Sequence, residues 1–348
     1  MSLKVSGAAP WLLGGILLLS PSAIQGQSVP RPGLLDLPMS ARFAGSAESM
    51  GAPLQATLGD ALGQASLIDS SHAGQLHLSY VDYFAGTAMA SALYARQPKE
   101  RKWLWHTGLR NLGYGDFTGR DPVGTETGIF SAADVAWVSG VSVPVDSNLT
   151  VATTLWMGQS GLADRRSVFG QVDISANYYR RDRKIRLAAM WRPWGGLHNT
   201  NSTGASGRFE SDMRVSLAKG FQNAPFVLHV TYDELQQWDL APEGYYDDSI
   251  DPLTGDTLSS GTWAFGDQLL RHLAIGAGLN ISENLGFRFG YHHRRRQELR
   301  LANAPGTAGF AWGLDFKVRR FHLAIARNTY HTAGASTHLS IRTRLSER

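Results

Sequence analysis

The chain has 348 residues, a formal net charge of +4 and no cysteine, and these facts exclude several classes of protein. Without cysteine there are no disulfides, thiolate zinc sites, iron–sulfur clusters or lipid-modified N-terminal cysteine. A small positive surplus with no long basic tract argues against nucleic-acid binding. The length fits one large domain or two ordinary ones, because single barrels routinely exceed about 200 residues.

The composition favours strands over helices as membrane-crossing elements. Aromatic residues make up 10% of the chain and charged residues 18%, whereas soluble proteins carry roughly 25% charged residues. Many aromatic and few charged residues suit a sheet that faces lipid. The mean hydropathy of −0.19 is too polar for a bundle of membrane-spanning helices, each of which needs about 20 mostly apolar residues.

Residues 1–26 have the pattern of a secretory signal peptide. One early cation, Lys4, precedes the apolar run 11–19, which Ser20 and Pro21 end. This run is short for a membrane span, and no Lys/Arg stop-transfer cluster follows it, which favours a cleaved signal over an anchoring helix. We expect cleavage near Gly26; the exact bond stays open, because Ile24 departs from the small residue usual at that position.

Beyond the signal peptide, apolar residues recur at every second position, which places them on one face of a strand. The clearest runs are 285–293 and 308–318, with aromatic and aliphatic residues at alternate positions. Many of the expected strands have about ten residues, the length of a tilted strand that crosses a bilayer. Fourteen are expected, at 75–84, 87–96, 103–114, 131–143, 148–158, 168–179, 184–191, 208–218, 226–233, 271–281, 285–293, 308–318, 321–329 and 336–345.

The sequence predicts an all-β fold, a transmembrane antiparallel β-barrel of about fourteen strands. A soluble sandwich of two sheets gives the same alternation and is the alternative. Scattered charges opposite the apolar face favour the barrel, because a wet lumen tolerates them; they are Asp173, Arg288, Asp315, Lys317 and Arg342. Aromatic residues near strand ends are expected to form an interfacial girdle; they are Trp103, Trp105, Tyr178, Tyr179, Trp191 and Tyr330.

Three regions follow from this pattern. Residues 1–26 are the signal peptide, 27–74 form a plug, periplasmic or lumen segment, and 75–348 form the barrel. Within the second region, 54–68 is rich in Ala, Gly and Leu and is a candidate helix that plugs the barrel. Unequal connections are typical of barrels with short turns at one end and longer loops at the other, and the long loops are expected at 193–207 and 234–268.

The loop 234–268 is the leading functional surface, because it is too long for a simple connector. Its candidate partner-docking residues are Trp238, Asp239, Tyr245, Tyr246, Asp247, Asp248 and Trp263. The acidic residues fit turns better than a calcium site, since they lack the spacing of a known calcium loop. No nucleophile elbow, paired-histidine zinc motif or phosphate-binding loop is present, so we predict no enzyme activity, cofactor or metal.

A basic cluster, Arg294, Arg295 and Arg296, follows the strand 285–293. It is a candidate site for anionic lipid headgroups or polysaccharide phosphate. The alternative, which we prefer, is a solvated strand end with ordinary positive residues.

Several stretches resemble the PorV/PorQ group of outer-membrane proteins from the Bacteroidetes, in the same order and spacing over nearly the whole mature chain. One departure concerns residues 66–70, which lie where the group usually has an Asn-Pro-Ala turn. The matching stretches are Leu37-Pro38-Met39-Ser40-Ala41-Arg42, Leu112-Gly113-Tyr114-Gly115-Asp116-Phe117, 128–134, Leu235-Gln236-Gln237-Trp238-Asp239-Leu240, 271–273, 287–296, 309–310 and 330–338.

The resemblance implies a FadL-like barrel in the outer membrane, in contact with its lipid, and a non-enzymatic role in the type IX secretion system. That system exports cargo proteins and attaches them to the cell surface, and the implied partners are a PorZ-like surface protein and other secretion components. Two alternatives remain. One is a FadL-type channel for hydrophobic small molecules, and the other is a soluble exported binding protein.

Overall fold

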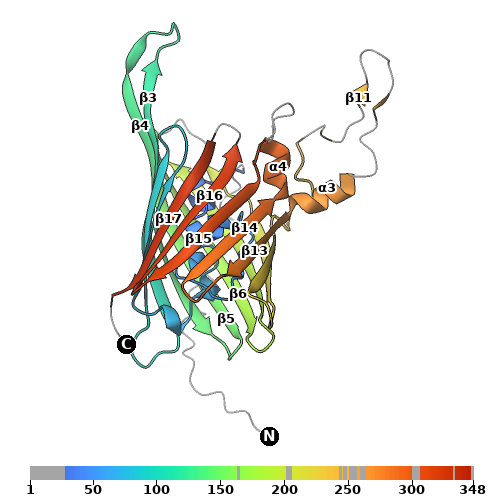
Figure 1. Cartoon of the computed structure of the whole chain (residues 1–348). Helices are drawn as coiled ribbons and strands as arrows, with labels where there is room; N and C mark the ends of the chain where they lie inside the picture. Colours follow the sequence, from blue (N-terminus) through green and yellow to red (C-terminus); the bar gives the residue numbers. More distant parts are fainter. Residues whose placement is uncertain are drawn as a thin grey trace.

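The computed structural model describes residues 28–162, 165–200, 206–242, 245, 249–250, 257–258, 264–299, 306–331 and 334–345. Within these ranges, fourteen strands pair antiparallel with their neighbours in sequence, and β1 pairs with β17 to close the barrel (Figure 1). The two-residue strand β8 adds to β7 as a fifteenth member of the sheet. The predicted antiparallel barrel of about fourteen strands is confirmed. The expected signal peptide lies outside the described residues.

The strands of the barrel follow one another along the chain as a meander, and β8 (Gly207–Arg208) precedes β9. Their bounds are β1 (Gln75–Asp82), β2 (Ala88–Arg96), β3 (Leu104–Arg120), β4 (Glu126–Pro144), β5 (Leu149–Leu162), β6 (Arg165–Arg180), β7 (Ile185–Asn199), β9 (Asp212–Gly220), β10 (Phe226–Tyr232), β13 (Leu273–Asn280), β14 (Leu285–His292), β15 (Phe310–Val318), β16 (Phe321–His331) and β17 (Gly334–Arg344).

The two ends of the barrel differ in the length of their connections. Short turns join β4 to β5, β6 to β7, β13 to β14 and β15 to β16 at the end near the C-terminus, which we call the lower end. At the opposite, upper end lie the long connections around β11 (Ser249–Ile250) and β12 (Thr257–Leu258), and the β3–β4 hairpin projects beyond the other strands (Figure 1). This asymmetry agrees with the predicted pattern of short turns and long loops.

Alternation along each strand gives the barrel an apolar outer face and a polar inner face. Asp173 and Arg288 are buried on the inner side, as predicted for the charges opposite the apolar face. The outer face carries large exposed side chains, which suit contact with lipid. Among them are Leu78, Leu109, Val135, Leu155, Ile174, Leu187, Leu217, Leu228, Ile275, Phe289, Trp312 and Leu339.

Strand β7 corrects the prediction that a loop begins at Pro193, because the strand continues to Asn199. Proline cannot donate a ladder hydrogen bond and is tolerated in strands at bulges. The β6–β7 register shifts between Val172 and Ile174, opposite Pro193. The missing N–H therefore falls at an irregularity of the ladder. The predicted strand 208–218 also shifts, since β9 begins at Asp212.

Tyr330 was predicted in the outer aromatic girdle, and this prediction was wrong. The residue shares the inward face of β16 with Ala324, Ala326 and Asn328, all of which are buried. Its hydroxyl donates to Glu48 over 3.3 Å. The alternation of side chains along β16 turns Tyr330 toward the lumen. Its position near a strand end does not reveal this direction.

The segment before β1 lies inside the barrel (Figure 1), where it forms the short helices α1 (Gly33–Asp36) and α2 (Ala41–Gly45). The prediction that residues 54–68 form a helix was wrong for an α-helix. It forms the 3₁₀ turns η2 (Asp60–Leu62) and η3 (Ala65–Leu67), followed by η4 (Ser70–His72). Pro53, Gly59 and Gly63 explain this, because proline and glycine disfavour a continuous helix. We call residues 29–72 the plug.

Hydrogen bonds join the plug to many sides of the inner wall. Ser66 N–H donates to the Ser175 hydroxyl of β6 over 3.0 Å, and Arg110 of β3 donates to the Leu37 carbonyl over 2.8 Å. On the opposite side, Ala41 N–H donates to the Ser340 hydroxyl of β17 over 3.0 Å. Inner-wall polar groups thus satisfy plug backbone that has no sheet partner.

No helix in the described part of the chain is both long and apolar enough to span a membrane.

Glycines in the wall make room for the plug. At Gly290 of β14, an added Cβ would overlap the Ser46 carbonyl, which is plug backbone. At Gly313 of β15, the Cα of Gly45 lies 3.4 Å from the position that a Cβ would take. The plug backbone and the wall therefore approach more closely than side chains on both would allow.

We expect Gly290→Ala to lower the free energy of unfolding by about 1–3 kcal/mol, because the new methyl group overpacks a backbone contact. Urea unfolding in lipid vesicles measures this. Gly63→Ala is the matched control, since nothing lies within 4 Å of its Cβ position. Equal unfolding midpoints for the two variants would contradict the tight fit of plug and wall.

Candidate functional site at the upper rim

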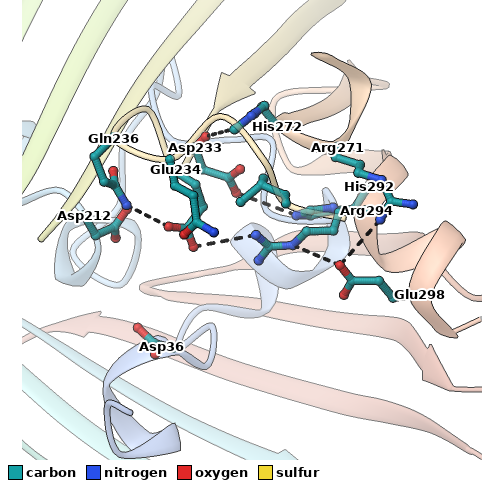
Figure 2. A network of polar contacts seen from close by, with 12 residues as sticks. Asp36, Asp212, Asp233, Glu234, Gln236, Arg271, His272, His292, Arg294 and Glu298 are labelled. Carbon is teal, nitrogen blue, oxygen red and sulfur yellow. Dashed lines mark hydrogen bonds and ion pairs between the residues drawn. The ribbon is translucent and has the colours of Figure 1, made fainter. Parts of the chain in front are cut away.

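The predicted docking loop and the predicted basic cluster meet at the upper end of the barrel. Helix α3 (Ala264–Arg271) ends just before β13, and α4 (His293–Leu299) directly follows β14. Because β13 and β14 pair from Ala274 and His292 downward, the two helices lie side by side, as Figure 1 also shows. We call residues 233–240, α3, His272 and α4 the rim site (Figure 2).

An aromatic stack holds the loop after β10 against the start of β13. The His272 ring lies between Tyr232, at a centroid distance of 4.8 Å, and Trp238, at 5.7 Å. Its two ring nitrogens lie 2.8 Å from the Asp233 carbonyl and 3.1 Å from the Trp238 carbonyl. His272 therefore fixes the backbone of 233–238, and Trp238 remains about half exposed.

Three of the predicted docking residues gather around α3. Trp238 packs on Phe265 at a centroid distance of 5.3 Å. Asp239 accepts a hydrogen bond from the Gln268 side chain. Tyr245 lies under the guanidinium of Arg271, 4.4 Å from its ring centroid. The predicted residues Tyr246, Asp247, Asp248 and Trp263 lie outside the described residues.

Helix α3 has a polar face toward the barrel and an apolar face away from it. Gln268 and Arg271 are buried, whereas Phe265 is 69% exposed and Leu269 and Leu270 are exposed as well. Trp238 extends this apolar face. We call Trp238, Phe265, Leu269 and Leu270 the apolar rim surface; scattered single apolar residues are ordinary on protein surfaces, but a contiguous group suggests an interaction.

Ion pairs tie α3, α4 and the loop together (Figure 2). Arg271 Nε lies 2.8 Å from Asp267 and its Nη1 lies 3.7 Å from Glu298. Arg294 lies 3.9 Å from Glu298 and 3.6 Å from Glu234. The Arg294 pairs are about one-third exposed, and such pairs contribute at most about 1 kcal/mol each.

The three arginines of the predicted basic cluster point in different directions. Successive residues of an α-helix lie about 100° apart, at 3.6 residues per turn. Arg294 reaches the loop, Arg295 reaches the plug, and Arg296 donates to the Gly306 carbonyl. The structure therefore brings Trp238, Asp239 and Tyr245 together around α3 but does not bring the arginines into one surface.

Arg295 connects the rim site to the plug. Its Nη2 lies 2.6 Å from the carboxylate of Glu48, and its guanidinium lies 4.3 Å from the Tyr330 ring centroid. Both charged side chains are largely buried, at 12% and 14% exposed. Burial alone would raise the pKa of Glu48, but the Arg295 charge holds that pKa below its ordinary value.

Sequence reasoning missed Glu48, Asp233 and His272. Asp233 lies 3.7 Å from His292, and although burial favours a higher pKa, the contact with His292 keeps the Asp233 pKa below its ordinary value. The alternation along its strand predicts that His292 faces inward. It does not predict that Asp233, on another loop, is its partner. Among the described residues, no group of His, Asp and Glu side chains is arranged to hold a metal ion.

No protein-family model matches the chain, and no curated protein matches it. Among solved structures, the toluene transporter TbuX of Ralstonia pickettii is similar with a TM-score of 0.51 and 11% identity, over 88% of this chain and 98% of that one. The P. putida toluene transporter TodX has a TM-score of 0.49 and 13% identity, over 88% and 100%. A Pseudomonas aeruginosa FadL homologue has 0.46 and 10%, over 92% and 100%.

At these identities, similarity shows the fold alone. The chain shares the barrel fold of TbuX over nearly the full length of both, and the predicted FadL-like barrel is confirmed as a fold. Membership of the PorV/PorQ group stays a prediction.

We expect Arg295→Gln or Glu48→Gln alone to lower the free energy of unfolding by about 3 kcal/mol, because each leaves a buried charge unpaired. The double variant should lose less than the sum of the two. A double-mutant cycle of urea unfolding tests this, with Arg294→Gln as the exposed control. Additive losses would mean that the two charges do not stabilise each other.

Proposed function

We propose that the protein is a non-enzymatic barrel of the outer membrane that passes hydrophobic small molecules, as a FadL-type channel. The fold and the apolar outer face support this location. TbuX, which has the same fold, is a toluene transporter. The observation within this chain that carries the proposal is a strip of apolar side chains on the inner wall.

This apolar strip crosses the inner faces of β2 to β6. It extends from Phe169, near the upper end of β6, to Leu104, at the lower end of β3. Elsewhere the inner wall is mainly polar, and the buried His106, Arg110 and Asp134 interrupt the strip on β3 and β4. An apolar molecule finds favourable contacts at the apolar side chains between them. Its members are Met89, Leu93, Leu104, Leu112, Val138, Trp156 and Phe169.

The plug covers the strip and must move for a molecule to pass. Leu34, Leu35, Met39, Leu58 and Leu62 pack against it. The cavity between plug and wall near Trp156 has a volume of only about 40 Å³. This space holds a water molecule but is far below the roughly 300 Å³ of a typical ligand site.

We expect lipid vesicles that contain the purified protein to take up a monoaromatic hydrocarbon or a fatty acid faster than empty vesicles do. The reason is that the strip offers an apolar path across the barrel once the plug shifts. Uptake of a radiolabelled solute measures this. A rate equal to that of empty vesicles would overturn the proposed function.

A reversible cross-link tests whether the plug moves. The ideal Cβ of Gly45 lies 2.9 Å from the Cβ of Ala326, which is closer than the separation of about 3.8 Å in a disulfide, so the plug backbone must move away from the wall by roughly 1 Å to accommodate the cross-link. Because the chain has no cysteine, Gly45→Cys with Ala326→Cys gives a single pair. Oxidation should slow uptake and reduction should restore it in the same preparation.

Docking of a surface protein is a second candidate function, and the apolar rim surface favours it. The partner implied by the resemblance is a PorZ-like protein, together with other type IX secretion components. Phe265 and Trp238 project from the upper end, and exposed aromatic residues are typical anchors of protein interfaces.

We expect Trp238→Ser with Phe265→Ser to reduce capture of a PorZ-like protein by at least about tenfold, the effect of losing aromatic anchors. A pull-down with purified components measures this. Phe84→Ser is the control, because Phe84 is equally exposed on the β1–β2 turn. No capture by the unchanged protein would count against docking.

A further inference from the structure

A cavity of about 550 Å³ opens at the lower end of the barrel, between the plug and the inner wall. The turn 282–286 and the strands β1 and β14 to β17 line it, and the plug contributes Ser40, Arg42 and 55–57. Its volume lies within the range of roughly 300–1,000 Å³ of small-molecule sites. Neither the rim site nor the apolar strip includes these residues.

The side chains that line this cavity are mainly polar, and its cations, Arg42, Arg288, Lys317 and Arg342, outnumber its carboxylates, Asp315 and Glu283. Strand parity directs His77, Lys317, His322 and Arg342 inward, alongside the buried Arg288. Phe316 and Leu323 have the outward parity on the same strands. The interior of the cavity is therefore polar and positively charged, which disfavours an apolar ligand.

The carboxylates near the cavity are already used by two of the arginines. Arg42 lies 3.0 Å from Asp60 and 3.5 Å from Asp315. Arg288 forms an ion pair with the other oxygen of Asp315. These two arginines and two aspartates balance in charge, and Glu283 is on the exposed turn at the mouth.

Arg342 and Lys317 are positive charges in addition to these balanced pairs. Neither has an ion-pair or side-chain hydrogen-bond partner among the described residues, and both line the cavity. Inward-facing cations without counter-charges repel one another, so an anion that enters between them relieves this repulsion. An arginine fork and a lysine ammonium are also the donors that bind oxyanions in proteins.

We propose that this cavity binds a small oxyanion, a phosphate or a carboxylate, that enters from the aqueous phase at the lower end. The barrel wall separates the cationic side chains from the outer apolar face, so a lipid headgroup in the surrounding bilayer does not reach them. Arg342 and Lys317 bind the anion from β17 and β15. The site does not depend on whether the barrel conducts hydrophobic molecules.

Isothermal titration calorimetry of the full chain in detergent micelles tests the proposal, with inorganic phosphate and acetate titrated at constant ionic strength. We expect saturable binding of at least one of them. Arg342→Gln with Lys317→Gln should weaken it by at least about tenfold, since two charge-assisted contacts are lost. Arg320→Gln removes an exposed cation from the neighbouring turn and should leave binding unchanged.

Circular dichroism establishes that each variant is folded before titration. Stronger binding of phosphate favours a phosphate ligand, and stronger binding of acetate favours a carboxylate ligand; both results support the site. The proposal is overturned if the unchanged protein binds neither anion at about 10 mM, or if the folded double variant binds as tightly as the unchanged protein. Arg342→Gln alone and Lys317→Gln alone supply two independent variants, and each is expected to bind more weakly than the unchanged protein.

Discussion

The closure of the sheet between β1 and β17 is the constraint on which the rest of the structure depends. An open edge would leave a row of backbone N–H and C=O groups unpaired, and in hydrocarbon each such group costs several kcal/mol. Closure removes that edge and divides every strand between an outer and an inner surface. The apolar outer face and the polar lumen are both consequences of it.

A closed barrel of this size encloses a lumen that its own wall does not fill. The plug fills part of it in two different ways. On the β2–β6 side, leucines of the plug pack against the apolar strip, and hydrophobic burial stabilises the contact. On the β14–β17 side, Gly290 and Gly313 allow backbone to approach backbone. The unfilled remainder is the cationic cavity at the lower end.

An ion pair joins the rim site to the plug inside the barrel. Arg295 belongs to α4 at the upper end, and Glu48 belongs to the plug. Through Glu298, which lies 3.7 Å from Arg271 and 3.9 Å from Arg294, the same helix α4 also contacts α3. These contacts connect the plug to the helix that carries the apolar rim surface. The proposed transport and docking functions therefore do not exclude each other.

The sequence by itself determined the strands and their two faces, because the alternation within each strand depends on no distant residue. Only the pairing of β1 with β17 decided between a closed barrel and a sandwich of two sheets. The sequence also determined which residues face inward along a strand, as for Asp173 and Arg288. Only the tertiary structure decided the partners, such as Glu48 for Arg295, because residues 247 positions apart meet only after the plug enters the closed barrel. It also separated Arg294, Arg295 and Arg296, since a helix turns successive side chains away from one another.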